Sequence, residues 1–366
     1  MKTVSFSKIL RSGQRRWMTT ALICLALTLP LLAAGPDQTL AAGKVKLKVQ
    51  SAFPTKFPIV GNSVPVLADT ARTISDGEIE LKIYEPRKLA PTLEIFDAIA
   101  SGTLDAGAAY PGYWVGKNSA FNLFAAVPFG PTADEFLAWF YEGGGMELWR
   151  ELYGKHNIVP LLAGLNSPEA GGWFTKEIKS LADLKGLKVR WAGLGANILK
   201  DLGVSTSLIP AGEVVTSLQK GILDGAEVGN PFIDKAFGMD KGAKFYYFPG
   251  WHQTFGTVEL MINKAKWEKL TERQRAIIET SARASTIHSL AQGAALQADA
   301  MDYFKKEGIQ IRRYPADVLQ AIKDQTPKTL AAESAKNPDF KKVWESMKAL
   351  MDKYEVYATY NSLEIK

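Results

Sequence analysis

The chain has 366 residues, of which 46% are hydrophobic and 22% are charged. A chain of this length is too long for one core of ordinary size, so two domains are expected. Its formal charge of +6 is concentrated at the start: the first 42 residues carry five basic groups and one acid, and the rest carries 39 basic and 37 acidic groups. A body this close to neutral excludes nucleic acid as an expected partner.

The first 42 residues are typical of a secretory signal peptide. A basic segment over residues 2–16 precedes an apolar run over 18–34, and small residues near positions 34 and 42 offer two cleavage sites. The mature chain is therefore expected to be exported. Arg15 and Arg16 resemble the pair of a twin-arginine export signal, and ordinary basic charge before the apolar run is the other interpretation.

Export also bears on the cysteine chemistry. The single cysteine, Cys24, lies inside the apolar run and follows Ile23 rather than a small residue, so no lipid anchor is expected on it. The mature chain would then have neither a disulfide nor a catalytic thiol. No later segment reaches the roughly 18 apolar residues that a membrane span needs.

The body of the chain begins with a strand, a helix and a strand over residues 44–51, 64–75 and 77–84, which is a βαβ unit. The next segment, 94–107, has a counterpart at 213–227. Both predict a helix, a glycine stop, a Leu-Asp pair and a small-residue strand. This short match either reflects a common turn or indicates two lobes that are built alike.

Each of these two segments continues into an aromatic, proline-containing loop, at 110–114 and at 228–232. Two lobes that each present such a loop predict a ligand cleft between them.

Arg190 is the leading candidate for a binding residue. It ends a strand pattern over 186–190 that follows another strand at 171–176 and precedes a helix at 196–203. Ligands of open α/β sheets bind at the carboxyl ends of strands, and a guanidinium held there is suited to an anion. A surface ion pair is the other interpretation of a lone arginine.

Two acids and an amide lie at comparable positions: Glu169 precedes the 171–176 strand, Glu227 ends the second repeat, and Gln253 follows Trp251. Each could be a solvated loop residue. If the three converge near Arg190, their oxygens would make a site for a hard cation of the sodium or calcium type, completed by the bound anion.

Catalytic motifs are weak. His156, His252 and His288 are far apart and lack the spacing of a zinc site, so they are not predicted as ligands. No Gly-x-Ser-x-Gly elbow occurs. The glycines at 193 and 195 open a helix as a dinucleotide fingerprint does, but Ile198 stands where the third glycine would be.

Two long helices complete the chain. A capping box at Thr271 and Gln274 opens a helical pattern that extends to Gly308, either as one spine across both lobes or as two helices in line. Near the end, an apolar stripe packs either on its own core or on a second subunit. The stripe consists of Phe340, Val343, Trp344, Met347, Leu350, Met351 and Tyr354.

With these segments in place, the sequence resembles the periplasmic solute-binding subunits of the tripartite ATP-independent periplasmic (TRAP) transporters, the DctP-type family, and most of all their 2-oxo acid binding branch. The resembling segments extend over most of the mature chain, in a specific order. They are Ala125–Phe129, Glu142–Gly145, His156–Val159, Gly171–Phe174, Leu184–Arg190, Leu223–Gly225, Tyr246–Trp251 and Asn263–Lys264.

The resemblance implies an α/β, two-lobed periplasmic binding protein fold with a ligand cleft between the lobes and a long spine helix. The expected parts are a signal peptide at 1–42, the first part of lobe I at 43–163, the first part of lobe II at 164–250, a return to lobe I at 251–270, the spine helix at 271–308, and the remainder of lobe II with a C-terminal helix at 309–366.

The resemblance also implies site residues. The carboxylate-binding arginine of the family falls on Arg190, and the metal ligands of the 2-oxo acid branch fall on Glu169, Glu227, Val228 and Gln253. The branch has glutamine near position 169, tryptophan at 228 and glutamate near 253, so two positions look exchanged while the number of carboxylates is kept. Val228 would bind through its backbone carbonyl. Sodium or calcium is the implied ion, with no organic cofactor.

Walls of the cleft are expected from aromatic residues, although each could equally belong to the core. The candidate residues beside the substrate are Tyr113, Trp114, Trp173, Asn230 and Phe232.

The function that the resemblance implies is capture of a small organic carboxylate, such as pyruvate or lactate, and its delivery to the membrane permease of a TRAP transporter. An exported metal-dependent enzyme with Glu169 or Glu227 as base is a second hypothesis, and a ligand-binding partner of a sensor is a third. The resemblance to this branch also implies a homodimer in which the subunits exchange a C-terminal helix. The apolar stripe from Phe340 to Tyr354 fits that use.

Overall fold

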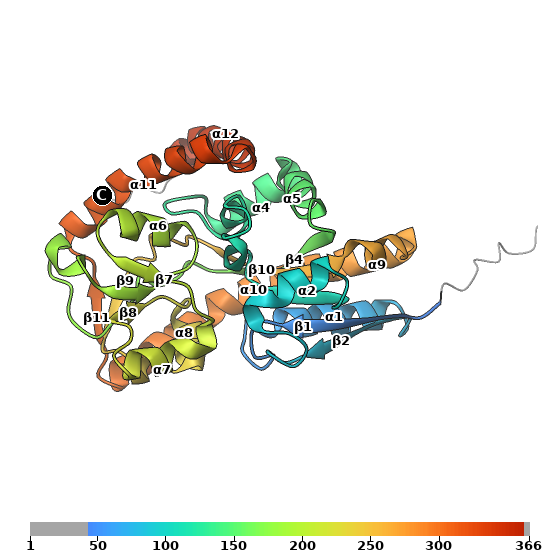
Figure 1. The fold of residues 1–366 in the computed structure, drawn as a ribbon, viewed down its shortest axis with the longest axis horizontal. Coiled ribbons are helices and arrows are strands. Elements are labelled where there is room, and N and C mark those ends of the chain that lie inside the picture. The colour runs from blue at the N-terminus through green and yellow to red at the C-terminus, as the bar shows by residue number, and fades with distance from the viewer. Residues whose placement is uncertain (1–42, 362–366) are drawn as a thin grey trace, which may run out of the picture. The chain divides into compact units, whose positions relative to one another are not determined.

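The computed structural model describes residues 43–361, so the predicted signal peptide and twin-arginine pair lie outside the described residues. The compact unit that starts at Lys44 contains two β-sheets, each covered by helices (Figure 1). This confirms the predicted α/β class with two lobes. No helix within residues 43–361 has the length and apolar character needed to cross a bilayer.

The first sheet has the strand order β2-β1-β3-β10-β4. Strand β1 pairs in parallel with β2 and β3, and β10 runs antiparallel between β3 and β4. Its strands are β1 (Val45–Ser51), β2 (Ile79–Tyr84), β3 (Ala106–Ala109), β4 (Ile158–Asn166) and β10 (Gly256–Asn263). The helices of this part of the chain are α1 (Ser63–Ile74), α2 (Ile95–Ala100), α3 (Phe121–Ala125), α4 (Ala133–Glu142), α5 (Gly145–Gly154) and α9 (Lys264–Glu268).

The second sheet has the order β11-β9-β5-β8-β6-β7, with β5 antiparallel to both of its neighbours. Its strands are β5 (Gly172–Phe174), β6 (Lys188–Arg190), β7 (Ser205–Ser207), β8 (Gly225–Ala226), β9 (Phe245–Phe248) and β11 (Gln310–Arg313). The helices here are α6 (Leu194–Asp201), α7 (Val214–Gln219), α8 (Pro231–Phe237) and α11 (Ala316–Lys336).

The two sequence repeats have the same structure. Each begins with one 3-10 turn (Thr92–Glu94 and Ala211–Glu213), continues as a short helix (α2 and α7), and ends in a buried strand (β3 and β8). The glycine stops, Gly102 and Gly221, both have positive φ, of 80° and 67°, which a glycine adopts without steric cost. The match therefore reflects a shared unit, one copy in each lobe.

Within residues 43–361, the chain passes from one sheet to the other three times. The first crossing runs from the end of β4 at Asn166 to β5, the second from β9 to β10, and the third is α10 (Glu272–Lys306). The predicted lobe boundaries stay a prediction. These crossings nevertheless place residues 167–171 and 249–255 between two sheets.

Helix α10 is one continuous helix, so the single-spine interpretation is confirmed over two helices in line. Its start contributes Ile278 and Ala282 to the core of the first sheet, and its end contributes Phe304 to the core of the second. The capping box forms as predicted, with Thr271 Oγ1 accepting from the Gln274 amide at 3.2 Å. This helix joins both lobes along its length (Figure 1).

Polar residues fix α10 against β4, the edge strand of the first sheet. Ser285 Oγ donates to the Ala163 carbonyl at 2.7 Å, and Thr286 Oγ1 donates to the Leu162 carbonyl at 2.9 Å. Ser289 Oγ accepts from the Leu165 amide at 2.9 Å. An edge strand exposes unpaired backbone groups, and here the helix satisfies them.

The C-terminal helix α12 (Pro338–Asn361) packs against α4 and α5 of the same chain (Figure 1). Phe340, Val343 and Met347 are buried in the core that contains Trp139 and Trp149. Trp344, Leu350 and Met351 pack against the same core, so the predicted stripe covers its own core as far as Met351.

Glu259 lies fully buried in β10, in the middle of the first sheet. Trp114 Nε1 donates to its Oε1 at 2.6 Å, and Tyr153 hydrogen-bonds to its Oε2. Burial raises the pKa of Glu259 to about 8, although both donors act in the opposite direction. The folded protein thus keeps this acid neutral at mildly acidic pH.

We predict that Glu259→Gln changes the pH dependence of stability. The unfolded acid titrates near 4.5 and the folded one near 8, so between these values the unfolded chain binds fewer protons and wild-type stability falls as pH rises. The loss is at most about 1.4 kcal/mol per pH unit. Urea unfolding at pH 5, 6 and 7 should show that the free energy of unfolding of the variant, relative to that of wild type, increases with each pH step. A constant difference would contradict the assignment.

Candidate functional site

A pocket lies where the crossings meet both sheets. Its empty volume is about 480 Å³, including the part that is open to solvent. Its lining comes from both lobes and from the first two crossings. The residues are Phe53, Val60, Tyr110, Tyr113, Asn166, Glu169, Arg190, Ala192, Ala211, Glu227, Val228, Ile233, Phe237, Gln253, Gly256, Thr257 and Val258. All four predicted metal ligands, and Arg190 and Tyr113 of the predicted substrate contacts, are therefore at this pocket.

Arg190 is held at the end of β6 by an ion pair with Glu227. Its Nη1 donates to Glu227 Oε1 at 2.9 Å and to the Glu227 carbonyl at 2.6 Å, while its Nε donates to the Ile209 carbonyl at 3.2 Å. The side chains are only 3% and 2% exposed. No acceptor in the described chain lies within hydrogen-bond distance of Nη2, so this nitrogen is available to a ligand.

The local strand pairing explains this geometry. Arg190 and Ala226 are partners in the parallel β6–β8 ladder, and the Glu227 amide donates to the Arg190 carbonyl at 3.2 Å. Glu227 Oε1 also accepts from the Ala192 amide at 2.6 Å. The two strand ends thus hold the guanidinium and the carboxylate side by side.

Glu169 and Gln253 come from the first and second crossings, which lie against each other because the Glu169 amide donates to the Gln253 carbonyl at 3.1 Å. Tyr110 donates from its hydroxyl to Gln253 Oε1 at 3.2 Å. Asn166, at the end of β4, donates to Glu169 Oε1 at 3.5 Å. Glu169 Oε2 has no hydrogen-bond partner among the described residues.

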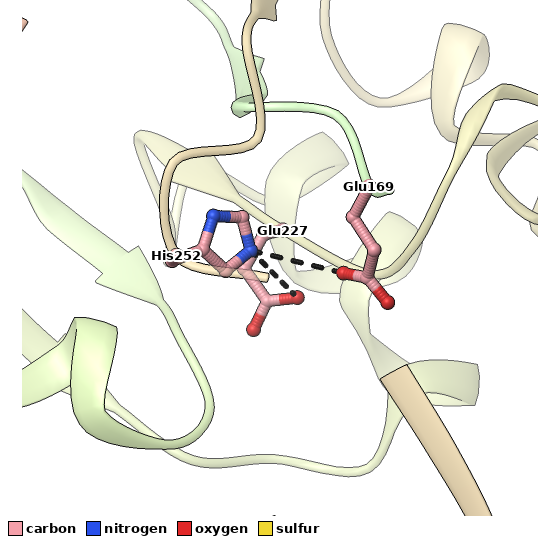
Figure 2. A group of neighbouring side chains, drawn as sticks. All are labelled: Glu169, Glu227 and His252. Atoms are coloured by element: carbon pink, nitrogen blue, oxygen red, sulfur yellow. Dashed lines mark ion pairs between the residues drawn. The ribbon is translucent and has the colours of Figure 1, made fainter. Parts of the chain in front are cut away.

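His252, which the sequence did not predict as a site residue, lies beside both carboxylates. Figure 2 shows one ring nitrogen directed toward Glu169 and Glu227; the distances from Nε2 are 3.7 Å and 3.9 Å to their Oε2 atoms. The three ligand atoms lie within 4.8 Å of one another, and all three residues are buried. A zinc-type spacing rule misses this histidine because its neighbours come from distant segments.

Burial controls the protonation of this cluster. Desolvation, and then the Glu227 charge, raise the pKa of Glu169 well above its ordinary value. Desolvation lowers the pKa of His252 to about 4, so its ring is neutral at pH 7. Burial and the Glu169 charge also raise the pKa of the Tyr110 phenol. A cation among these groups would relieve the repulsion between the two carboxylates.

The residues present fit a metal ion. Glu169, Glu227 and Gln253 line one pocket, and the buried imidazole of His252 lies beside the two carboxylates. Glu169 Oε2 and His252 Nε2 both lack hydrogen-bond partners among the described residues. The Val228 residue lines the same pocket, which is compatible with the predicted use of its carbonyl.

Four predicted substrate contacts lie outside the lining. Trp114 is buried against Glu259, and Trp173 stacks on Tyr246 at 3.9 Å between ring centroids, with its Nε1 donating to Asp234 at 2.8 Å. Both indoles are buried in cores, Trp114 from the 3-10 turn Pro111–Trp114 and Trp173 from β5. Phe232 is half-buried on α8, with its amide donating to Gln297 Oε1 at 3.1 Å.

Asn230 is the fourth predicted substrate contact that lies outside the pocket lining. It caps α8, its Oδ1 accepting from the Ile233 amide at 3.2 Å. Its Nδ2 donates to Asn166 Oδ1 at 2.6 Å and to Ser167 Oγ at 3.1 Å. Asn230 therefore acts behind the pocket wall, by orienting Asn166.

Two sheets joined by crossing segments around a buried, charged pocket define a solute-binding fold. Residues 52–337 match the family model described as bacterial extracellular solute-binding protein, family 7 (DctP), and the chain belongs to this family. The predicted family is thereby confirmed. Members of this family act outside the cytoplasm, as the predicted localisation requires.

Among curated relatives, a monocarboxylate 2-oxoacid-binding periplasmic protein of Nostoc is 32% identical over 81% of this chain and 82% of its own length. A TRAP transporter solute-binding protein from Bordetella bronchiseptica, with copurified calcium and picolinate, has a TM-score of 0.85 at 30% identity and covers 87% of this chain and 95% of its own. One from Pseudoalteromonas atlantica, with sodium and pyruvate, has a TM-score of 0.83 at 31% identity, covering 87% and 97%.

We predict that Arg190 and Glu227 are strongly coupled in stability. Arg190→Met leaves the Glu227 carboxylate buried without its partner, which should cost about 3–5 kcal/mol, and Glu227→Gln should be destabilising for the reciprocal reason. The double variant should lose clearly less than the sum of the single losses, as measured by urea unfolding at pH 7. Additive losses would show that the pair contributes nothing beyond its separate contacts.

Proposed function

We propose that this protein captures a small monocarboxylate of the 2-oxo or 2-hydroxy acid class, together with a cation, and delivers it to the membrane permease of a TRAP transporter. The observation that carries the proposal is the buried guanidinium of Arg190, which keeps Nη2 without an acceptor in the described chain while facing a pocket that also holds two carboxylates. An anion and a cation bound together would complete this arrangement.

The proposed contact to the ligand is made by Nη2. Both hydrogens of Nη1 are directed to Glu227, so a carboxylate would meet Nη2 rather than the Nη1–Nη2 edge that a forked pairing uses. Low dielectric in the buried pocket strengthens such a charge-assisted bond. Tyr113 and Phe53 supply apolar wall, which suits a short alkyl or methyl group.

The proposed cation lies between Glu169, Glu227 and Gln253, with the Val228 carbonyl as a further ligand. Sodium and calcium accompany the acids in the two solved relatives at 30% and 31% identity, which supports a metal ion beside the acid here. The ion would neutralise the carboxylates and bind the oxygens of the acid that Arg190 does not reach.

Capture without chemical conversion is part of the proposal. The family consists of solute-binding proteins, whereas an enzyme acting on the same acids would use Glu169 or Glu227 as a base. Ligand that is released unchanged after incubation supports capture, and conversion of the ligand would support the enzyme. Secretion to the periplasm through the segment at 1–42, and handover to a permease rather than to a sensor, belong to the same proposal.

The ligand assignment predicts a selective effect of Arg190→Lys. This change keeps the positive charge beside Glu227 but removes the planar donor, so pyruvate affinity should fall by about 10- to 100-fold, the equivalent of one charge-assisted hydrogen bond. Isothermal titration with pyruvate and lactate, with and without calcium, measures the effect. Arg72→Lys, at an exposed position on α1, is the matched control. Unchanged affinity in Arg190→Lys contradicts the assignment, and mass spectrometry of copurified molecules would identify the natural acid.

We also propose a homodimer through the end of α12. Val356, Tyr357 and Tyr360 are 64%, 56% and 87% exposed, although apolar and aromatic side chains favour burial. One related structure is described as a mixed occupancy dimer. The triple change of these residues to serine should convert a dimer to a monomer in light-scattering chromatography, with pyruvate binding retained. A wild-type monomer at all concentrations would contradict the proposal.

A further inference from the structure

We propose that His252 Nε2 is a direct ligand of the bound metal, and that this nitrogen makes the site select a divalent transition ion, of the manganese, cobalt or zinc class, over sodium or calcium. The inference rests on the cation in the proposed function but changes its identity, because none of the oxygen ligands already assigned would create such a preference.

The geometry supports a single ion. Bonds from zinc-like ions to imidazole nitrogen and carboxylate oxygen measure about 2.0–2.2 Å, so two ligand atoms on one ion lie at most about 4.3 Å apart. His252 Nε2 is 3.7 Å from Glu169 Oε2 and 3.9 Å from Glu227 Oε2. These two separations are too long for hydrogen bonds and short enough for an ion between the imidazole and either carboxylate (Figure 2). The three ligand atoms together lie within 4.8 Å of one another, so binding all three to one ion needs only a small side-chain adjustment.

Burial makes the unused ligand atoms significant. The His252 side chain is 0% exposed, and neither ring nitrogen has a hydrogen-bond partner among the described residues. Glu169 Oε2 is likewise buried without a partner. A buried polar atom without a partner is costly, and His252 Nε2 and Glu169 Oε2 lie 3.7 Å apart. One ion would satisfy both.

The ring is also fixed in place. Its centroid is 4.9 Å from that of Trp191 and 5.3 Å from that of Trp251, both in edge-on contact. Gly195 leaves the space for this, because a Cβ there would lie 2.9 Å from the His252 Cβ and 2.7 Å from Trp191 Nε1. The glycine that resembled part of a dinucleotide fingerprint instead allows α6 to approach the histidine.

Donor chemistry and charge both favour a divalent transition ion. Sodium and calcium prefer oxygen ligands, whereas imidazole suits first-row transition ions and zinc. Two glutamates and Arg190 carry a formal charge of −1 in the buried cluster once the ion has displaced any carboxyl proton. A divalent ion and a monocarboxylate then bring the pocket to neutrality, whereas a sodium ion would leave a buried negative charge.

The test compares metal binding in the metal-free wild-type protein, in His252→Gln and in His288→Gln, which alters an exposed histidine of α10. Cobalt affinity, followed by visible absorption and by competition with zinc, should fall at least about 10- to 100-fold in His252→Gln and stay unchanged in His288→Gln. Calcium affinity should change little in either variant. Equal cobalt affinity in all three proteins would overturn the inference.

A second measurement does not depend on a variant that folds. Pulsed EPR of the wild-type protein with one equivalent of copper should detect nitrogen coupling from a bound imidazole, and the coupling should persist in His288→Gln. Its absence would overturn the inference. Pyruvate titration with calcium, run in parallel, separates the two ideas: pyruvate binding without nitrogen coupling overturns only the role of His252, and nitrogen coupling without any carboxylate binding overturns only the proposed ligand.

Discussion

The buried pair of Arg190 and Glu227 is the constraint on which the site depends. Placing two charges at 3% and 2% exposure costs several kcal/mol for each ion, and only close contact together with backbone hydrogen bonds offsets this. The pairing of β6 with β8 provides those contacts, because it aligns Arg190 with Ala226 and brings the Ala192 amide to Glu227. The ends of β6 and β8 in the second sheet therefore hold the Arg190 cation and the Glu227 anion side by side.

The remaining site residues lie on the chain between the sheets rather than on either sheet. Glu169, His252 and Gln253 belong to the first two crossings, so their positions depend on how the lobes are joined. The crossings contact each other through the Glu169 amide and the Gln253 carbonyl, and α10 adds a third connection that is anchored on the edge of β4. Direct contacts between the lobes add to these connections. Leu194 and Ala211 of the second lobe are buried in the core that contains Trp139. Phe57 meets Phe237 edge-on at 4.8 Å, and the ion pair of Arg87 with Glu213 is exposed, which limits it to about 1 kcal/mol or less.

The parts of this arrangement that could be predicted from the sequence share one property, which is that their signal is local. The repeat, the capping box at Thr271 and the strand that ends in Arg190 are all visible within about a dozen residues. Glu169, Glu227 and Gln253 were candidates from their places beside predicted strands, and the resemblance to a known family added Val228. His252 was missed because its partners are 83 and 25 residues away in the sequence, so no spacing pattern could reveal them. Trp114 and Trp173 were misplaced for a related reason: an aromatic residue near a strand end has the same sequence signature whether it faces a ligand or, as here, a buried acid such as Glu259 or Asp234.

The exchange of carboxylate and amide between positions 169 and 253 changes how the donor groups are placed relative to His252. The resemblance implies an amide near 169 and a carboxylate near 253, whereas this chain has the carboxylate at 169 and the amide at 253. The number of negative charges is kept, but one of them has moved from the second crossing to the first. On the second crossing the neutral Gln253 already accepts a hydrogen bond from Tyr110, and the adjacent His252 points at the relocated carboxylate instead. A carboxylate at 253 would have placed two donors, this carboxylate and the adjacent imidazole of His252, on the second crossing. Moving the charge distributes the donors around the ion, with Glu169 on the first crossing, His252 on the second and Glu227 from the strand end of lobe II, so that a cation between them would tie both crossings to the residue that positions Arg190.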